Sequence, residues 1–262
     1  MLKEERHKTI LNILSVKGSV TISLLCRMFN VSEMTIRRDL DELAETDALM
    51  RTHGGATLPH SDMTLLTEPP FEMRMEGNFN QKMDIAHAAM DYIKDGQKIF
   101  LDSGSTNCLL AQMLDNSKQL VVVTNAINIV VELIPRTNIT IFPIGGDFRK
   151  HTYSCTGFFA EENIKNMRVD IAFVGVSGIG TQGQLYNLNT MEIGVKRAML
   201  EVAPKIIVLA DASKIGREDF VSFGDLCSVN TLITNDSVSE SLLRKYSDMG
   251  VDVRIAKRTT FE

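Results

Sequence analysis

The N-terminal part of the chain contains three short segments whose apolar side chains recur every three or four positions, which is typical of amphipathic helices. The predicted helices cover residues 3–14, about 24–29 and about 33–45. Ser32 stands where the third helix needs an N-cap, and Ile36 and Leu40 lie on its inward face. Three short helices with a tight second turn predict a helix-turn-helix, whose last helix enters the major groove of DNA.

Apolar and polar residues alternate over a short segment that follows the third predicted helix. Residues 49–56 read Leu-Met-Arg-Thr-His-Gly-Gly-Ala and are expected to form a β-hairpin wing, with the pair Gly54-Gly55 at its flexible end. Arg51 is expected to meet phosphates or the minor groove from this wing. The N-terminal pattern therefore predicts a winged helix-turn-helix.

From about residue 81 onward, short runs rich in β-branched apolar residues alternate with helical segments. Strands are predicted at residues 98–101, 120–124, 139–142, 171–174, 205–209, 231–234 and 251–255. Helices are predicted near residues 81–93, 106–114, 126–134 and 239–248. This alternation predicts an α/β domain with an open, mostly parallel, doubly wound sheet.

A change of composition separates the two patterns. Residues 59–62 read Pro-His-Ser-Asp, and Pro69-Pro70 follow, a pair that disfavours helix. The predicted organisation is a DNA-binding domain over residues 1–58, a linker over 59–79 and an α/β domain over 80–262.

Charge and composition exclude some classes of protein but do not identify the function. The net charge of the 262 residues is −5, and residues 1–58 carry eight cations and eight anions, so DNA binding is inferred from pattern and not from charge. The chain has no apolar run of eighteen residues, and its first residues are charged, so neither a membrane span nor a signal peptide is expected. The four cysteines lie far apart and the histidines lack metal-ligand spacing, which favours reduced thiols, no metal site and a cytoplasmic protein.

Small and polar residues follow three successive predicted strands. They are Asp102-Ser103-Gly104-Ser105-Thr106, then Thr124-Asn125, then Gly145-Gly146. In such sheets ligands bind at the carboxyl ends of strands, and a helix N-terminus with hydroxyl and glycine neighbours suits an anion. A capped turn is the simpler explanation of each loop alone, but three together favour a phosphate site.

The N-terminal module resembles the DeoR family of bacterial transcriptional regulators. The resemblance rests on Val31-Ser32-Glu33-Met34-Thr35-Ile36-Arg37-Arg38-Asp39-Leu40 and on Arg51-Thr52-His53-Gly54-Gly55-Ala56, and Asp47 stands where the family usually has glycine. Arginine can grip a phosphate or read guanine. The expected DNA-contacting residues are Ser32, Met34, Thr35, Arg37, Arg38, Arg51 and His53.

The resemblance extends across the second domain, from Lys82 to about Lys214. It implies a fold similar to ribose-5-phosphate isomerase and a sugar phosphate as effector, and Ser105 stands where the family more often has threonine. The expected effector-binding residues are Lys82, Asp102, Ser103, Gly104, Ser105, Thr106, Thr124, Asn125, Gly145, Gly146, Ser177 and Lys214.

The main alternative is a sugar-phosphate isomerase with an appended DNA-binding domain. The segment Val174-Gly175-Val176-Ser177 lacks the two acids of the isomerase's Asp-Gly-Ala-Asp, and Glu192 is expected to be a solvated helix residue. A second alternative is a second domain that only oligomerises. We therefore expect no catalytic residue and no cofactor.

The function expected from the resemblance is repression of a carbohydrate-utilisation operon that a sugar phosphate relieves. The expected partners are operator DNA, the sugar phosphate and further copies of the chain in a homodimer or larger assembly, since one winged helix reads few base pairs.

Overall fold

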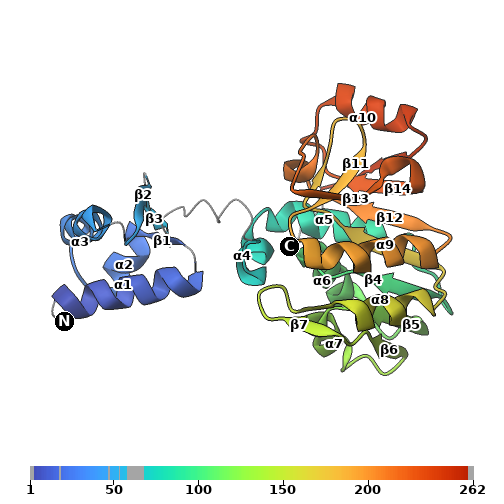
Figure 1. Ribbon diagram of the computed structural model, residues 1–262, viewed down its shortest axis with the longest axis horizontal. Helices are drawn as coiled ribbons and strands as arrows, with labels where there is room; N and C mark the ends of the chain where they lie inside the picture. Colours follow the sequence, from blue (N-terminus) through green and yellow to red (C-terminus); the bar gives the residue numbers. More distant parts are fainter. Residues whose placement is uncertain (1–2, 18, 47, 53, 58–67, 259–262) are drawn as a thin grey trace. The chain divides into compact units, whose positions relative to one another are not determined.

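The computed structural model describes residues 3–17, 19–46, 48–52, 54–57 and 68–258, and the chain divides into two units between Pro69 and Pro70 (Figure 1). Residues 59–67 of the linker expected over residues 59–79 lie outside the described residues. Its last part, however, is structured and belongs to the C-terminal unit. Helix α4 (Phe71–Glu76) lies there, and Phe71 is buried in the core of that unit.

The N-terminal unit is a winged helix-turn-helix. Its elements are α1 (Lys3–Lys17), β1 (Ser19–Thr21), α2 (Ile22–Phe29), α3 (Glu33–Glu45), β2 (Met50–Thr52) and β3 (Gly55–Thr57). The three predicted helices and the wing are confirmed. Strand β1 was not predicted; it pairs antiparallel with β3 and gives the small sheet the order β1-β3-β2.

Local capping explains where the two central helices begin and end. The Thr21 hydroxyl accepts a hydrogen bond from Leu24 N at 3.3 Å at the start of α2, and Asn30 ends that helix in the left-handed region, at φ 52°. At the start of α3 the Ser32 hydroxyl accepts from Thr35 N at 3.3 Å, as predicted. The turn between the two helices is therefore encoded locally.

Gly55 has a steric role in the wing. A Cβ atom at this position would lie 1.8 Å from the carbonyl oxygen of Val20, which is impossible. The glycine therefore allows β3 to lie against β1, and the expectation that it only supplies a flexible end is corrected.

A buried ion pair joins α1 to α3. Arg6 donates from Nε and Nη2 to the two carboxylate oxygens of Asp39, at 2.7 and 2.9 Å, beside a core that contains Ile10 and Leu40. Burial alone would raise the pKa of Asp39, but the hydrogen bonds and charges of Arg6, and then of His7, lower it. The pair holds the third helix at a fixed place on the first.

The C-terminal unit is built on a seven-stranded, fully parallel sheet with the order β15-β14-β12-β9-β4-β5-β6. The strands are β4 (Lys98–Leu101), β5 (Leu120–Thr124), β6 (Ile139–Pro143), β9 (Ile171–Gly175), β12 (Ile206–Leu209), β14 (Thr231–Thr234) and β15 (Asp252–Ile255). All seven predicted strands are confirmed. Strand β4, which comes first along the chain, lies inside the sheet. Strands β5 and β6 follow on one side of it, and β9, β12, β14 and β15 follow on the other.

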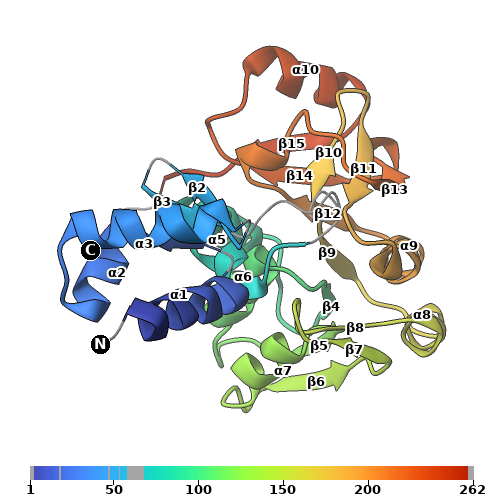
Figure 2. The ribbon, with the colours of Figure 1, turned by 60° about the vertical axis from the view of Figure 1, so that its left-hand side comes forward.

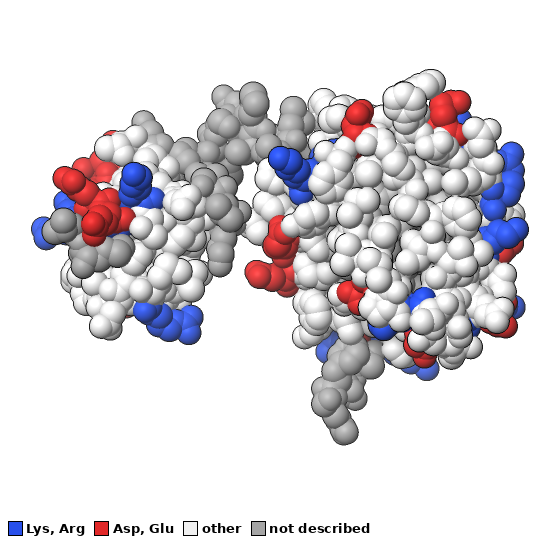
Figure 3. Space-filling model, turned by 90° about the horizontal axis from the view of Figure 1, so that it is seen from below, with Lys and Arg blue, Asp and Glu red and all other residues white. Residues whose placement is uncertain are grey.

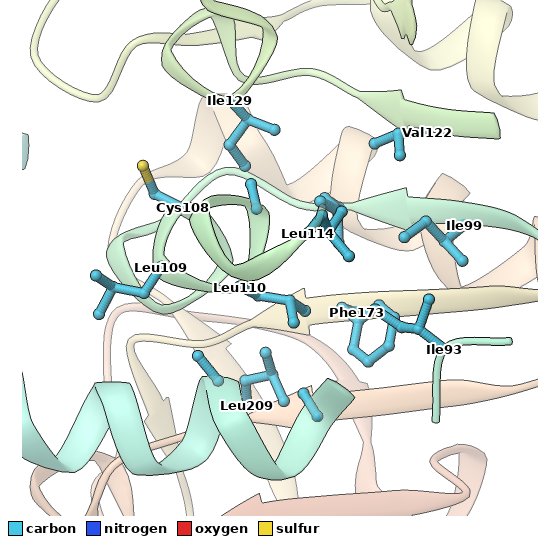
Figure 4. Close-up of a cluster of buried hydrophobic side chains, with 14 of the residues drawn as sticks. Ile93, Ile99, Cys108, Leu109, Leu110, Leu114, Val122, Ile129, Phe173 and Leu209 are labelled. Carbon is cyan, nitrogen blue, oxygen red and sulfur yellow. The ribbon is translucent and has the colours of Figure 1, made fainter. Parts of the chain in front are cut away.

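Helices cover both faces of this sheet (Figures 1 and 2). One face packs against α5 (Phe79–Met90), α6 (Ser105–Met113) and α7 (Ile127–Leu133), and the other against α8 (Phe158–Lys165), α9 (Ile193–Val202) and α10 (Glu240–Asp248). Strand side chains alternate between the two layers, so that Ile99 and Leu101 enter the first core and Phe100 the second. Figure 4 shows part of the first core, which Leu110 of α6 shares with Phe173 and Leu209.

Short elements escaped the sequence prediction. They are α4, the hairpin β7 (Asp147–Arg149) and β8 (Ser154–Thr156), the antiparallel sheet of β10 (Gly178–Ile179), β11 (Gln184–Asn187) and β13 (Val221–Asp225), and the one-turn helices η2 (Thr190–Glu192), η3 (Ala212–Lys214) and η4 (Leu226–Ser228). Elements of two to six residues are too short for periodicity to mark them. The glycine-rich segment Gly178–Gly183 forms β10 and a turn into β11.

Across the described part of the chain, no helix combines the length and the apolar character that crossing a bilayer requires.

The Arg6–Asp39 pair yields a testable expectation. Asp39→Asn should destabilise the N-terminal unit by about 1.5–3 kcal/mol, because it leaves the buried guanidinium without its counter-charge. Since the pKa of Asp39 is lowered in the folded chain, its stabilisation is complete above the ordinary carboxyl pKa and is lost as pH falls through the folded value. Amide hydrogen exchange of α1 and α3 in the full chain should show wild-type protection falling below about pH 4 and a flatter profile in the variant.

Glu33→Gln is the matched control, because it removes an exposed carboxylate of α3 whose partner is the exposed Arg37. Equal protection in wild type, Asp39→Asn and Glu33→Gln would contradict the structural role of the pair.

Candidate DNA-binding surface and strand-end site

The exposed face of α3 carries most of the predicted DNA-contacting residues. Met34 is 76% exposed, and Arg37 and Arg38 are also exposed. Arg37 pairs with Glu33 at 2.7 Å, whereas no hydrogen bond or ion pair engages the Arg38 side chain within the described residues. Arg38 can therefore reach DNA without first losing a partner.

Two acidic residues of α3 pair with cations of α1. Asp39 is buried against Arg6, and Glu42 pairs with Lys3 and approaches His7. In the view of Figure 3, acidic and basic side chains of the N-terminal unit lie close together. Internal pairing thus explains how a segment with no net charge can still present unpaired cations to DNA.

Three other predicted DNA-contacting residues are engaged within the unit. The Ser32 hydroxyl lies 2.9 Å from that of Thr35 at the start of α3, and Arg51 pairs through Nε with Asp41 Oδ1 at 2.8 Å. Arg51 also donates to the carbonyl oxygen of Gly55 within the wing, and its ion pair with Asp41 joins the wing to α3. His53 lies outside the described residues.

In the C-terminal unit, a buried ion pair lies where β4 and β9 end. Asp102 is 1% exposed and Lys196 is 3% exposed, with Lys196 Nζ 2.6 Å from Asp102 Oδ2. The same oxygen accepts from Gly175 N at 2.8 Å, and Lys196 also donates to the Gly175 carbonyl oxygen. Burial raises the pKa of Asp102, which the charge and hydrogen bond of Lys196 oppose. Asp102 is thus part of the frame of this edge.

The next strand end is fixed to the same loop. Asn125 Oδ1 accepts from Ser103 N at 3.1 Å, and Asn125 Nδ2 donates to the Cys155 carbonyl oxygen of β8. The Thr124 hydroxyl accepts from Ala126 N. These two predicted ligand residues are therefore also occupied by bonds within the unit.

The hydroxyls of Ser103, Ser105 and Thr106 are different. None of them makes a hydrogen bond within the described part of the chain, and they surround the N-terminus of α6, a helix of nine residues. Gly104, at φ 146°, turns the chain from β4 into that helix. The first backbone N–H groups of a helix have no partner within it, so this loop offers donors to an anion.

Two lysines approach the same edge of the sheet. Helix α5 runs toward the start of β4, so its first turn lies at the edge where β4 ends, and Lys82 is in that turn. Lys214 follows β12, and Asp211 lies between the two charges, bonded to Asn78 and to Ser213. Burial lowers the pKa of both lysines and Asp211 opposes this, while each is also lowered by neighbouring cations. We call loop 102–106, Lys82, Asp211 and Lys214 the strand-end site.

Arg74 of α4 was missed by the sequence analysis. Its charge lowers the pKa values of Lys82 and Lys214 as a lesser influence, after burial, and that of Glu192 as well. The Arg74 carbonyl oxygen accepts a hydrogen bond from Lys82 Nζ, which places Arg74 next to that lysine. Its position inside the expected linker hid it, although Pro70 directly before a helical segment is a helix-start signal.

Glu192 is buried, which corrects the expectation of a solvated helix residue. Its Oε1 accepts from Arg149 Nη1 at 2.5 Å and from the Ser154 hydroxyl at 3.1 Å, and its Oε2 accepts from Asn187 at 2.9 Å. Burial alone would raise the pKa of Glu192, but the charges of Lys196 and Arg149 lower it. Glu192 is held as an ionised acceptor, and Arg149 is part of this network.

The remaining predicted ligand residues are Gly145, Gly146 and Ser177, which lie outside the strand-end site as defined above. Gly145 and Gly146 are exposed between β6 and β7. Ser177 is bonded through its N–H and its hydroxyl to the Tyr186 carbonyl oxygen, within the β10–β11 hairpin. Among the described residues, no group of three His, Cys, Asp or Glu side chains is arranged to hold a metal ion.

Both units of the chain match models of known protein families. Residues 6–62 match the DeoR-like helix-turn-helix domain, and residues 77–236 match the DeoR C terminal sensor domain. The glycerol-3-phosphate regulon repressor of Escherichia coli (strain K12) is 31% identical, over 97% of this chain and 100% of its own length. The HTH-type transcriptional repressor GlcR of Bacillus subtilis (strain 168) is 31% identical, over 98% of both chains.

Among solved structures, ribose 5-phosphate isomerase A of Methanocaldococcus jannaschii is 20% identical. It aligns over 53% of this chain and 55% of that one, with a TM-score of 0.40.

The exposed arginines of α3 give a second expectation. Arg38→Ala and Arg37→Ala should each weaken binding to an operator fragment, selected from genomic DNA by the wild-type chain, by about 1–3 kcal/mol. Arg38→Ala should reduce the binding free energy more, because Arg37 must break its ion pair with Glu33 before it can contact DNA. Fluorescence anisotropy over a range of salt concentrations measures this, and loss of a phosphate contact should reduce the salt slope by about 1.

Arg168→Ala, which removes an exposed arginine of the C-terminal unit, is the control and should bind as wild type does. Unchanged affinity in both α3 variants would show that this face does not contact DNA.

Proposed function

Because the chain belongs to the DeoR family of DNA-binding transcriptional regulators, we propose that it represses a carbohydrate-utilisation operon and that a phosphorylated sugar or polyol relieves this repression. The strand-end site is proposed to bind the effector. One observation carries the proposal. Lys82 and Lys214, both partly buried, lie at the edge of the sheet where α6 begins, and the hydroxyls of the loop there make no hydrogen bond within the described residues.

The chemistry of this edge suits a phosphate dianion. Lys82 and Lys214 supply positive charge where burial keeps electrostatic interactions strong, and Ser103, Ser105 and Thr106 supply hydroxyl donors. Asp102, Thr124 and Asn125 are proposed to hold the loop in place without touching the ligand. The name of the Escherichia coli relative refers to a phosphorylated polyol, which is consistent with such a ligand.

The isomerase alternative is disfavoured. Proton transfer along a sugar needs a free acid or base, and the carboxylate of Glu192 accepts bonds from three partners and is kept ionised. The valines at 174 and 176 cannot replace an acid. The relatives that align over nearly the whole chain are named as repressors and not as enzymes.

Regulation is proposed to work by linkage between the two units. An effector can shift the chain away from its DNA-binding state only if it binds the two states with different affinity. A single winged helix reads few base pairs, so the repressor is proposed to act as a homodimer or a larger assembly.

Thermal unfolding against matched phosphorylated and free compounds tests the effector site. The panel contains ribose 5-phosphate, glucose 6-phosphate, fructose 6-phosphate and glycerol 3-phosphate with ribose, glucose, fructose and glycerol. A ligand at about one hundred times its dissociation constant should add roughly 2.7 kcal/mol to the stability of the folded chain. We expect this from a phosphorylated member and not from its free counterpart.

Lys214→Met should abolish the stabilisation, whereas Lys118→Met, which removes a lysine of the loop before β5 at the other edge of the sheet, should retain it. If no member stabilised the wild-type chain, the second unit would be assigned to assembly.

A further inference from the structure

Four phenylalanines on neighbouring elements of the C-terminal unit are exposed. The exposed fractions are 47%, 48%, 71% and 71% for Phe142, Phe148, Phe158 and Phe159. Phenylalanine is among the residues most often buried in folded proteins, and an exposed apolar group of this kind often marks a surface that binds another molecule. We call these four residues the phenylalanine corner.

The phenylalanine corner is formed by β6, β7 and α8, which lie close together in Figures 1 and 2. Phe142 is next to last in β6 and faces the side of the sheet that α8 covers, because Ile139 and Ile141 face the other side. Ala160 of α8 shares the core of the covered side with Ile144, which directly follows β6. Phe142 therefore lies at the edge of the sheet near the start of α8.

The hairpin of β7 and β8 brings the other three phenylalanines to the same place. Phe148 is on β7, which pairs antiparallel with β8, and β8 leads through Gly157 into α8. Phe158 and Phe159 are the first two residues of that helix, and their rings meet edge to face with centroids 5.8 Å apart. Gly157 adopts φ 87°, which glycine reaches without strain, at the turn that presents the two rings.

The two outer strands of the seven-stranded sheet differ in charge. Strand β15 carries Asp252 and Arg254, which pair at 2.8 Å, and charges on an edge strand discourage pairing with another chain. Strand β6 reads Ile-Thr-Ile-Phe-Pro, without a charged residue, and within the described residues it pairs with β5 alone. The edge beside the phenylalanine corner therefore lacks the protection that the opposite edge has.

The exposed area of the phenylalanine corner is comparable with what a stable interface needs. A phenylalanine offers about 150–250 Å², so the four residues together present roughly 350–600 Å². An ordinary stable interface takes about 800 Å² from each partner, of which a little more than half is apolar. The four rings therefore supply most of the apolar area that one side of such an interface contains.

The charges around the phenylalanine corner favour a second copy of this chain as the partner. They are of both signs, because Asp147 and Lys150 are exposed on the β7–β8 hairpin, and Glu162 and Lys165 are about half exposed on α8. Across a two-fold axis a surface meets itself, so the anions of one copy can face the cations of the other. Such a contact also closes on itself, which prevents open-ended association.

We propose that two copies of the chain form a two-fold homodimer through the phenylalanine corner, with the four rings buried between them. This inference rests on the proposed function in one respect, because that function requires an assembly of at least two chains. It assigns the assembly to residues that are not part of the strand-end site.

Sedimentation velocity of the full chain, at micromolar concentrations and without effector, tests the inference. Wild type should sediment at twice the mass of the chain or more. Phe158→Glu and Phe159→Glu should each raise the dissociation constant of the dimer by about tenfold or more, because each places a charge in an apolar interface. Phe220→Glu is the matched control, since Phe220 is 55% exposed outside the phenylalanine corner, and it should sediment as wild type does.

Thermal unfolding of the same variants separates assembly from effector binding. Both corner variants should remain folded and keep the stabilisation by the panel's phosphate compound, because the strand-end site is unchanged. A wild-type chain that sediments as a monomer would overturn the inference and leave the corner to a different partner. Assembly of both corner variants with wild-type affinity would also overturn it, and either result would leave the proposed effector site intact. Absence of stabilisation by every panel member would overturn that effector site and not the dimer contact.

Discussion

The strand-end site of the C-terminal unit, which is the proposed effector site, depends on the buried ion pair between Lys196 and Asp102. Removing two charges from water is costly, and Gly175 offsets part of this cost, because its N–H donates to Asp102 Oδ2 and its carbonyl oxygen accepts from Lys196. These bonds join α9 to the ends of β9 and β4. They therefore fix the point at which the chain leaves β4 for the loop that begins α6.

This frame divides the polar residues of the edge into two groups. Asp102, Thr124 and Asn125 are occupied by internal bonds and give the loop its shape. The hydroxyls of Ser103, Ser105 and Thr106 make no hydrogen bond within the described residues. Lys82, although bonded to α4, and Lys214 bring positive charge to the same site. A site built in this way is preorganised, because binding need not first order the loop.

The layout of the fold followed from the sequence because local patterns determine it. Continuous apolar runs predicted the parallel strands, and Ser32 marked the start of α3. Polar residues that are buried with a distant partner could not be predicted. Arg6 and Asp39 are 33 residues apart, and Arg149 and Glu192 are 43 apart, so no local pattern shows that they pair. Arg74 was missed because the adjacent prolines indicated a linker and concealed the start of α4.

Occupation of the strand-end site and binding of operator DNA are proposed to be linked. The most direct measurement is the affinity for operator DNA with and without saturating effector, together with the affinity for effector with and without operator DNA. Linkage predicts that both affinities fall by the same factor, of about 5 to 150 for a typical coupling. An effector that binds the chain equally well with and without operator, and leaves operator affinity unchanged, would contradict the account.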